Sequence, residues 1–129
     1  MKTKLTKSVV DLTAFEKYSS QNEVVTLPGT GAVTMDMTTA PIFKMNLTGN
    51  VTLTIAPKFP PVLNESFSYL QTLVFVKQDS VGGRVVTWPN NCVWTTATAP
   101  AMGPTANKLD VVEMITFDAG FTWYCKKLT

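Results

Sequence analysis

The fold is best predicted from one stretch of the chain, Val74-Phe75-Val76-Lys77-Gln78-Asp79-Ser80-Val81-Gly82-Gly83-Arg84-Val85-Val86-Thr87-Trp88-Pro89. Two runs rich in β-branched and aromatic residues, which favour strands, flank residues 79–83. The two glycines can take the positive φ that a tight reversal needs. The stretch therefore predicts a β-hairpin whose second strand ends at Trp88-Pro89.

Two more hairpins are predicted on either side of this stretch. In the first, Phe43, Met45 and Leu47 alternate along one face of a strand, and a Gly-Asn pair supplies the turn. In the second, a glycine ends a three-residue connection. The hairpins join strands 42–47 and 51–55 through Gly49-Asn50, and strands 110–117 and 121–125 through Asp118-Ala119-Gly120.

Short strands and proline-rich connections complete the pattern. Several short strands at this spacing, with no parallel crossover helix, predict an all-β fold, specifically an antiparallel β-sandwich of jelly-roll type. Its core is expected to contain Leu53, Phe75, Val86 and Ile115. The remaining predicted strands are 24–27, 32–38 and 92–94, and the predicted loops are 56–65 and 90–107.

A chain of 129 residues makes one domain, and its β pattern begins near residue 24. Residues 24–129 are therefore assigned to the β-sandwich domain and residues 1–23 to an N-terminal arm or linker. Within this arm, residues 9–18 have the apolar spacing of a short helix, but an extended arm fits the segment as well. The segment is expected either to reach a partner protein or to be a frayed chain terminus.

The run from residue 67 to residue 77 is apolar on both faces of a predicted strand. Tyr69, Leu73 and Phe75 lie on one side, and the intervening residues are also largely apolar. A two-layer domain normally covers only one face of each sheet, so the other face needs a partner. We therefore expect a homo-oligomer.

The composition excludes several classes of protein. Hydrophobic residues make up 45% and charged residues 16% of the chain, which excludes general disorder. The net charge of +2 is spread without a basic stripe, so nucleic-acid binding is not expected. Apolar runs are too short for a membrane span. The cysteines, Cys92 and Cys125, are expected to be free thiols in a chain assembled in a reducing cytoplasm.

Residues for catalysis or for binding a cofactor or metal are not found. The sequence has no histidine, which removes the commonest general base and metal ligand. The carboxylates that could pair for glycoside hydrolysis, because they lie close together in the sequence, are Asp110 with Glu113 or Asp118. Asp118 lies in a predicted turn and Asp110 at a strand start, where carboxylates usually accept backbone hydrogen bonds. We therefore expect no catalytic residues, no cofactor and no metal.

Aromatic side chains are the better candidates for binding. The candidate contact residues are Trp88, Trp94, Trp123 and Tyr124, together with Arg84. Such rings can stack on sugars or on a partner, but at strand ends they also close a core. Arg84 can stack on Trp88 or pair with Asp79. Both interpretations stay open at this point.

Several phrases of the sequence together resemble a known family. The residues that carry the resemblance are Gly31-Ala32-Val33-Thr34-Met35-Asp36-Met37-Thr38, Phe43 to Thr54, the Gln78 to Pro89 phrase, Val93-Trp94 with Ala99-Pro100, and Asp110 to Tyr124. Their order is similar to that in small all-β modules of tailed-bacteriophage fibre and other virion proteins. The resemblance covers roughly residues 31 to 125. Cys125 departs from it, since glycine often follows the Trp-Tyr pair in that family.

The resemblance implies a virion structural module, commonly trimeric, with no catalytic residues. We therefore expect a non-enzymatic virion protein, either a small tail fibre or spike subunit or another subunit of the particle surface, that acts by assembly. A capsid decoration protein and a carbohydrate-binding adhesin that contacts host-surface glycan are the alternatives. The expected location is the virion, after assembly in the host bacterial cytoplasm. The expected partners are two further copies of the chain and, through residues 1–23, other virion proteins.

Overall fold

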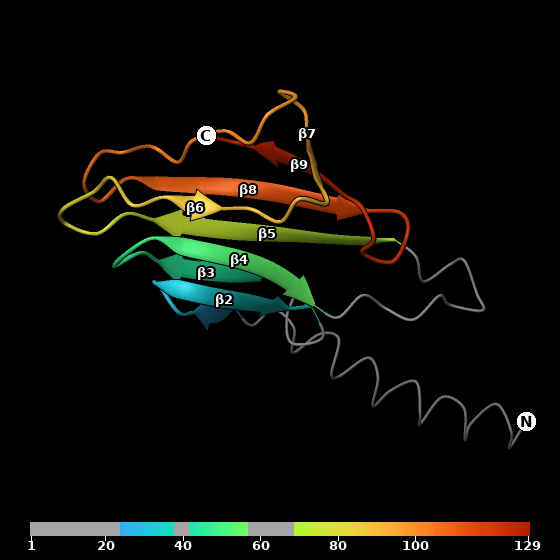
Figure 1. Ribbon diagram of the computed structural model, residues 1–129, viewed down its shortest axis with the longest axis horizontal. Coiled ribbons are helices and arrows are strands. Elements are labelled where there is room, and N and C mark those ends of the chain that lie inside the picture. The colour runs from blue at the N-terminus through green and yellow to red at the C-terminus, as the bar shows by residue number, and fades with distance from the viewer. Residues whose placement is uncertain (1–23, 38–41, 57–68) are drawn as a thin grey trace, which may run out of the picture.

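The computed structural model describes residues 24–37, 42–56 and 69–129 (Figure 1). The predicted arm or short helix at 1–23 and most of the proline-rich connection lie outside the described residues. Nine strands and no helix occur in the described part of the chain. The strands are β1 (Val24–Leu27), β2 (Gly31–Asp36), β3 (Ile42–Asn46), β4 (Val51–Ala56), β5 (Leu70–Lys77), β6 (Val86–Thr87), β7 (Cys92–Trp94), β8 (Leu109–Thr116) and β9 (Trp123–Lys127).

The strands form two sheets with an apolar core, which confirms the predicted all-β sandwich. The six-stranded sheet has the order β1-β3-β5-β8-β9-β7, and the three-stranded sheet has the order β2-β4-β6. In Figure 1 the strands lie side by side in nearly the same orientation, from β2 and β3 near the bottom, through β4 and β5, to β8 and β9 near the top. The largest fully buried side chains include Trp123, Phe43, Met35, Met45, Leu47, Leu53 and Met114.

The sandwich is mixed, and the expectation of a purely antiparallel arrangement was wrong. Five of the seven pairings between the described strands are parallel. From β1 to β6 the chain changes sheet at every connection, so strands that follow each other within one sheet run in the same direction. The two antiparallel pairings, β5 with β8 and β8 with β9, join the end of the chain to this parallel part.

Two of the three predicted hairpins are connections between the sheets. β3 and β4 flank the Gly49-Asn50 turn but belong to different sheets, and so do β5 and β6, which flank residues 78–85. Only β8 and β9 form a hairpin, and their connection spans residues 117–122 instead of three residues. A strand with alternating apolar residues can either pair with the next strand or face it across the core. Alternation in the sequence therefore does not show whether two successive strands form a hairpin.

Hydrogen bonds between successive turns replace those that a hairpin would make. Gly31 donates its backbone N–H to the carbonyl of Asn50 at 2.9 Å, and Val51 donates to the carbonyl of Val85 at 2.9 Å. Val85 in turn donates its N–H to the side-chain oxygen of Asn50 at 2.9 Å. The turns at one end of the sandwich therefore stack on one another, and this stacking aligns the strands of each sheet.

The predicted core is correct for two residues and wrong for two. Leu53 and Val86 are buried, with 1% and 8% exposure. Phe75 and Ile115 are half-buried on the other face of the six-stranded sheet, which we call the outer face. Phe75 lies on β5 and Ile115 on β8, and both of these strands carry apolar residues on their two faces. Lys77 shares the face of Phe75. Because the charge of Lys77 must reach water, that face points away from the core.

Candidate functional site

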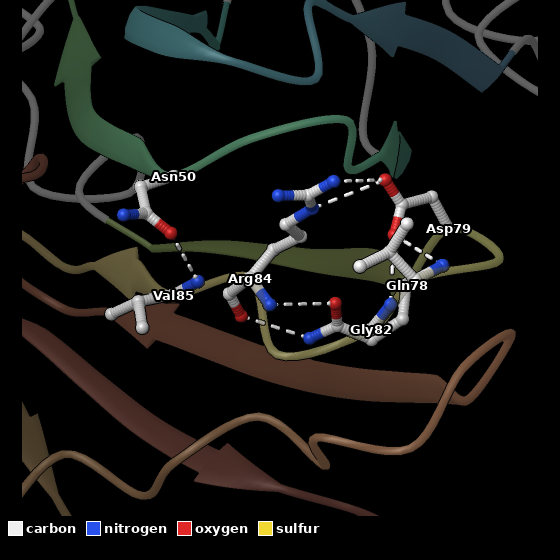
Figure 2. A network of polar contacts seen from close by, with 7 residues as sticks. Asn50, Gln78, Asp79, Gly82, Arg84 and Val85 are labelled. Carbon is white, nitrogen blue, oxygen red and sulfur yellow. Dashed lines mark hydrogen bonds and ion pairs between the residues drawn. The ribbon is translucent and has the colours of Figure 1, made fainter.

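The Gln78 to Pro89 phrase forms a self-contained turn. Gln78 is buried, with 2% exposure, and its amide bonds the backbone of Arg84 twice. Its Nε2 donates to the Arg84 carbonyl at 2.8 Å, and its Oε1 accepts from the Arg84 N–H at 3.0 Å (Figure 2). The Gln78 side chain thus makes the two hydrogen bonds that the backbone of a paired strand would make, and it closes the turn.

Asp79 holds the same turn from the other side. Its Oδ1 accepts backbone N–H groups of Val81 at 3.1 Å and Gly82 at 2.9 Å. Its Oδ2 accepts from Nε and Nη2 of Arg84 at 3.1 and 2.9 Å. The hydrogen bond from Arg84, together with that from Gly82, lowers the pKa of Asp79. The aspartate therefore stays ionised and keeps its position in the turn.

The two glycines of the phrase are required by backbone shape. Gly82 and Gly83 have φ values of 77° and 74°, in the region that favours glycine. A Cβ on Gly82 would also collide with the carbonyl oxygen of Pro104. Gly83 donates its N–H to that same oxygen at 2.9 Å. The structure of the turn therefore explains why these positions hold Gln78, Asp79, Gly82, Gly83 and Arg84.

Replacing Gln78 with leucine is expected to lower the free energy of unfolding by about 1–3 kcal/mol, because two backbone groups of Arg84 lose their partner. Gln71→Leu is the matched control, since Gln71 is exposed and its loss should change stability by only about 0.5 kcal/mol. Chemical denaturation of both variants measures the difference. Equal losses would show that the buried amide has no special role.

The three tryptophans predicted as candidate contact residues lie in the core. Trp88 and Trp94 are each 8% exposed, and their rings meet edge to face with centroids 5.3 Å apart. Trp123 is 1% exposed. Within the described residues, the indole N–H groups of Trp88 and Trp123 have no hydrogen-bond partner. These rings stabilise the sandwich by burial of apolar surface.

The other two candidate contact residues lie elsewhere. Arg84 is paired with Asp79 at 2.9 Å, in the turn. Tyr124 is 49% exposed on the outer face. The structure thus divides the five residues among the core, the turn and the outer face. Contact of any of them with a glycan or a partner stays a prediction.

The outer face of the six-stranded sheet is divided by a polar stripe, made of Gln71, Glu113 and Lys126. Gln71 donates from Nε2 to Oε2 of Glu113 at 2.8 Å. Glu113 on β8 lies opposite Lys126 on β9. The stripe thus crosses three neighbouring strands. It separates two apolar areas at opposite ends of the strands.

The first area is a shallow depression of about 300 Å³, which we call the apolar depression. Phe75 is half-buried there, and Val24 and Leu109 are 48% and 47% exposed. Lys44 and Lys77 also line it. Long lysine stems can cover apolar surface while their charges reach water. The complete lining is Val24, Lys44, Asn46, Phe75, Lys77 and Leu109.

The second area is an aromatic patch formed by Tyr69, Phe117 and Tyr124. The ring centroids are 5.7 Å apart for Tyr69 and Phe117, and 6.0 Å apart for Phe117 and Tyr124. All three rings are largely exposed, by 52%, 62% and 49% in chain order. Sequence reasoning did not single out Tyr69 or Phe117 for binding. The signal that they face outward was their spacing: Tyr69 is two residues from Gln71, and Phe117 is four residues from Glu113, so each shares a face with a polar residue.

The carboxylates that were considered for catalysis have structural partners. Asp110 is 1% exposed, and its Oδ2 accepts from the N–H of Gly103. Asp118 accepts the N–H of Thr122 at 2.8 Å within the β8–β9 connection. Glu113 belongs to the polar stripe. These contacts agree with the expectation that Asp110 and Asp118 accept backbone hydrogen bonds.

The two cysteines lie on neighbouring strands. Cys92 on β7 is half-buried and Cys125 on β9 is buried, and both are free thiols. A hydrogen bond between the side chains lowers the pKa of Cys92. The same contact, with burial, raises the pKa of Cys125. The Cys125 thiol donates to the backbone carbonyl of Trp123 at 3.5 Å.

The residues that the structure describes, 24–37, 42–56 and 69–129, offer neither a candidate metal site nor a helix that could span a membrane. They contain no group of three His, Cys, Asp or Glu residues placed to hold a metal ion. They also contain no helix that is long and apolar enough to span a membrane.

Comparison with known proteins identifies a family for this chain. A family model described as "Putative phage tail fibre C-terminal domain" matches residues 30–120, which is more than two thirds of the 129 residues. Comparison with curated proteins and with solved structures gave no match. The matched segment begins just before β2 and ends within the β8–β9 connection.

Proposed function

This chain belongs to the family of phage tail fibre C-terminal domains, and on that premise we propose that it is a small tail fibre or spike subunit that acts by assembly. The family gives it a structural role in the phage virion. The apolar depression is the observation that most directly supports assembly. Exposed apolar patches rimmed by polar residues mark interaction sites.

A second copy of the chain is the proposed occupant of the apolar depression. Phe75 is already half-buried in the single chain, so a neighbour that covers it completes its removal from water. With charged residues at 16% of the chain and a net charge of +2, identical subunits repel one another only weakly. We assign three copies to the assembly because the fibre modules that the sequence resembles are commonly threefold. Attachment to other virion proteins is assigned to residues 1–23.

Phe75→Glu is expected to separate the subunits, because it places a charge where apolar surface would be buried. Light scattering on the wild-type protein at micromolar concentration should give about three times the chain mass of 14.1 kDa, and the variant should give the mass of one chain. Val81→Glu is the matched control. Val81 is 71% exposed in the turn after β5 and does not line the apolar depression, so its variant should remain a trimer.

A wild-type protein that is monomeric at this concentration would contradict assembly through its own copies. A Phe75→Glu variant that keeps the wild-type mass would show that the subunits meet elsewhere. Placement on the tail, as opposed to the capsid surface of a decoration protein, is decided separately by the position of the chain in a reconstruction of the whole particle.

A further inference from the structure

The two cysteines point to the same side of two neighbouring strands. β7 pairs with β9 in parallel, so that Cys92 lies opposite Trp123 and Trp94 lies opposite Cys125. Residues that lie opposite each other share a face of the sheet, and Trp123, Trp94 and Cys125 are buried in the core. Cys92 is half-buried and packs against the same core. The two sulfur atoms therefore lie on the core side of the sheet, on a diagonal between the strands.

The two thiols are in contact, because a hydrogen bond joins their side chains. A disulfide between them needs a closer approach of the two backbones. Paired strands lie about 4.8 Å apart and rise about 3.3 Å per residue, so this diagonal is about 8 Å between Cα atoms. Disulfides usually join Cα atoms that are at most about 6.8 Å apart. One strand must therefore move about 1–2 Å toward the other before the bond closes.

β7 is the strand that can make this movement. It has three residues and ends the order of the six-stranded sheet, so β9 is its one neighbour among the strands that the structure describes. The carbonyl of Asn91 accepts from the N–H of Trp123 at 3.0 Å, and Thr95 donates to the carbonyl of Cys125 at 3.1 Å. A disulfide that closes against these bonds keeps some strain, and strained disulfides are easily reduced.

The two thiols differ in their reactivity toward an oxidant. The thiolate is the reactive form of cysteine. Cys92 is half-buried on the edge strand, and its hydrogen bond with Cys125 lowers its pKa. Cys125 is 1% exposed, and the same hydrogen bond, with burial, raises its pKa. Cys92 is therefore the thiol that reacts first, and Cys125 is held beside it to react second.

We propose that Cys92 and Cys125 form a reversible oxidation site, at which a peroxide converts the two thiols into a disulfide within one chain. The Cys92 sulfur attacks one peroxide oxygen, the O–O bond breaks, and the released hydroxide takes up the Cys92 proton. Cys92 is then a sulfenic acid. The Cys125 sulfur bonds to it, and the hydroxyl group leaves with the Cys125 proton. Two thiols are oxidised, and one peroxide becomes two water molecules.

The disulfide ties the last strand of the six-stranded sheet to its neighbour. A short strand at a sheet edge opens easily, because few contacts hold it. The bond keeps β7 beside β9 when the protein is exposed to oxidants, and a thiol reductant releases it. The apolar depression lies on the outer face and the cysteines lie on the core side, so this site does not depend on the proposed assembly.

The test exposes the reduced full-length protein to hydrogen peroxide, then denatures it in N-ethylmaleimide and measures its intact mass. The untreated protein should carry two maleimide groups, one on each cysteine. The treated protein should carry none and should be lighter than the reduced chain by two hydrogen atoms. Dithiothreitol should restore both thiols. Protein treated in urea is the matched control and should form the bond about tenfold more slowly, because the strands no longer hold the thiols together.

Single variants test the order of the two steps. Cys125→Ser is expected to stop at the Cys92 sulfenic acid, which dimedone traps. Cys92→Ser should react with peroxide about tenfold more slowly, because Cys125 is buried and keeps its proton. Serine at position 125 can still donate to the carbonyl of Trp123, and thermal melting shows whether each variant folds. If Cys92→Ser does not fold, Cys92→Ala takes its place.

Hydrogen exchange tests the effect on the strand, and the backbone amides of Val93 and Trp94 should exchange more slowly after oxidation. Phe75→Glu should form the disulfide as the wild type does, so a failure of the proposed assembly leaves this result unchanged. Two maleimide groups on the treated wild type overturn the proposal, and so does a disulfide that joins two chains. Equal peroxide rates for Cys92→Ser and Cys125→Ser contradict the order of steps. Unchanged exchange in β7 contradicts the role given to the bond.

Discussion

Replacing Phe43 with alanine is expected to lower the free energy of unfolding by about 3–5 kcal/mol. Phe43 is fully buried on β3, which has a neighbouring strand on each side in the six-stranded sheet. Strands held by backbone hydrogen bonds cannot move in to fill the space that the ring leaves, so a cavity remains. Urea unfolding at one fixed protein concentration measures the loss, because association adds to the apparent stability.

Phe117→Ala is the matched control for this experiment. Phe117 is 62% exposed on the outer face, so its removal leaves no cavity and should change stability by about 0.5 kcal/mol. The contrast between two phenylalanines tests which face of the six-stranded sheet is the core. A larger loss for Phe117→Ala than for Phe43→Ala would show that the two faces are exchanged.

Replacing Asp110 with alanine is expected to cost about 3 kcal/mol, because a buried carboxylate holds several groups together. The side chain is 1% exposed at the start of β8, and its removal leaves a buried N–H without a partner. Denaturation measures the loss, and Asp110→Asn, which keeps the shape, should lose less than Asp110→Ala. The groups that contact the carboxylate are Gly103 N at 2.6 Å, Thr129 Oγ1 at 3.0 Å, Lys108 Nζ at 3.1 Å and Lys127 Nζ at 3.6 Å.

The same carboxylate is expected to make stability depend on pH. Burial alone would raise the pKa of Asp110, but the hydrogen bonds from Gly103 and Lys108 outweigh it, and the pKa lies below its ordinary value of 3.8. A lowered pKa means that the folded protein binds the proton more weakly than the unfolded chain does. The stabilisation is therefore complete above about pH 4 and is lost as the pH falls below it.

Denaturation of the wild type and of Asp110→Asn between about pH 2 and pH 6 tests this dependence. The variant has no carboxylate at this position, so its stability should fall less steeply on the acid side. Asp79 and Asp118 also have lowered pKa values and remain in both proteins, so some acid dependence is expected in the variant. Identical slopes would contradict the role assigned to Asp110.

The candidate site could be predicted only in part. The phrase from Gln78 to Pro89 was found from its glycines and strand formers, but the pairing of the Gln78 amide with the Arg84 backbone is a tertiary contact. Tyr69 and Phe117 are far apart in the chain and meet only because β5 and β8 pair. Whether Trp88 packs or binds was left open, because a ring at a strand end suits both roles. Trp88 is buried, so in the single chain its ring packs in the core.

The sequence by itself determined where the strands and turns lie. Val33 and Met35 alternate with exposed neighbours along β2, and this period of two identifies a strand and its inward side. The same rule failed for β5, because apolar residues occupy both of its faces and only Lys77 and Gln71 distinguish them. Side-chain alternation thus specifies which residues are buried only where one face is polar.

Tertiary structure alone decided which strands pair and in which direction. Every residue except proline carries the same backbone N–H and C=O groups, so hydrogen bonding does not distinguish one partner strand from another. A turn such as Gly49-Asn50 reverses the chain equally well within a sheet or between two sheets. Here the turns stack through Gly31 and Asn50, which places β2 beside β4 instead of β3 beside β4. That choice depends on contacts between residues far apart in the sequence, which local propensity does not contain.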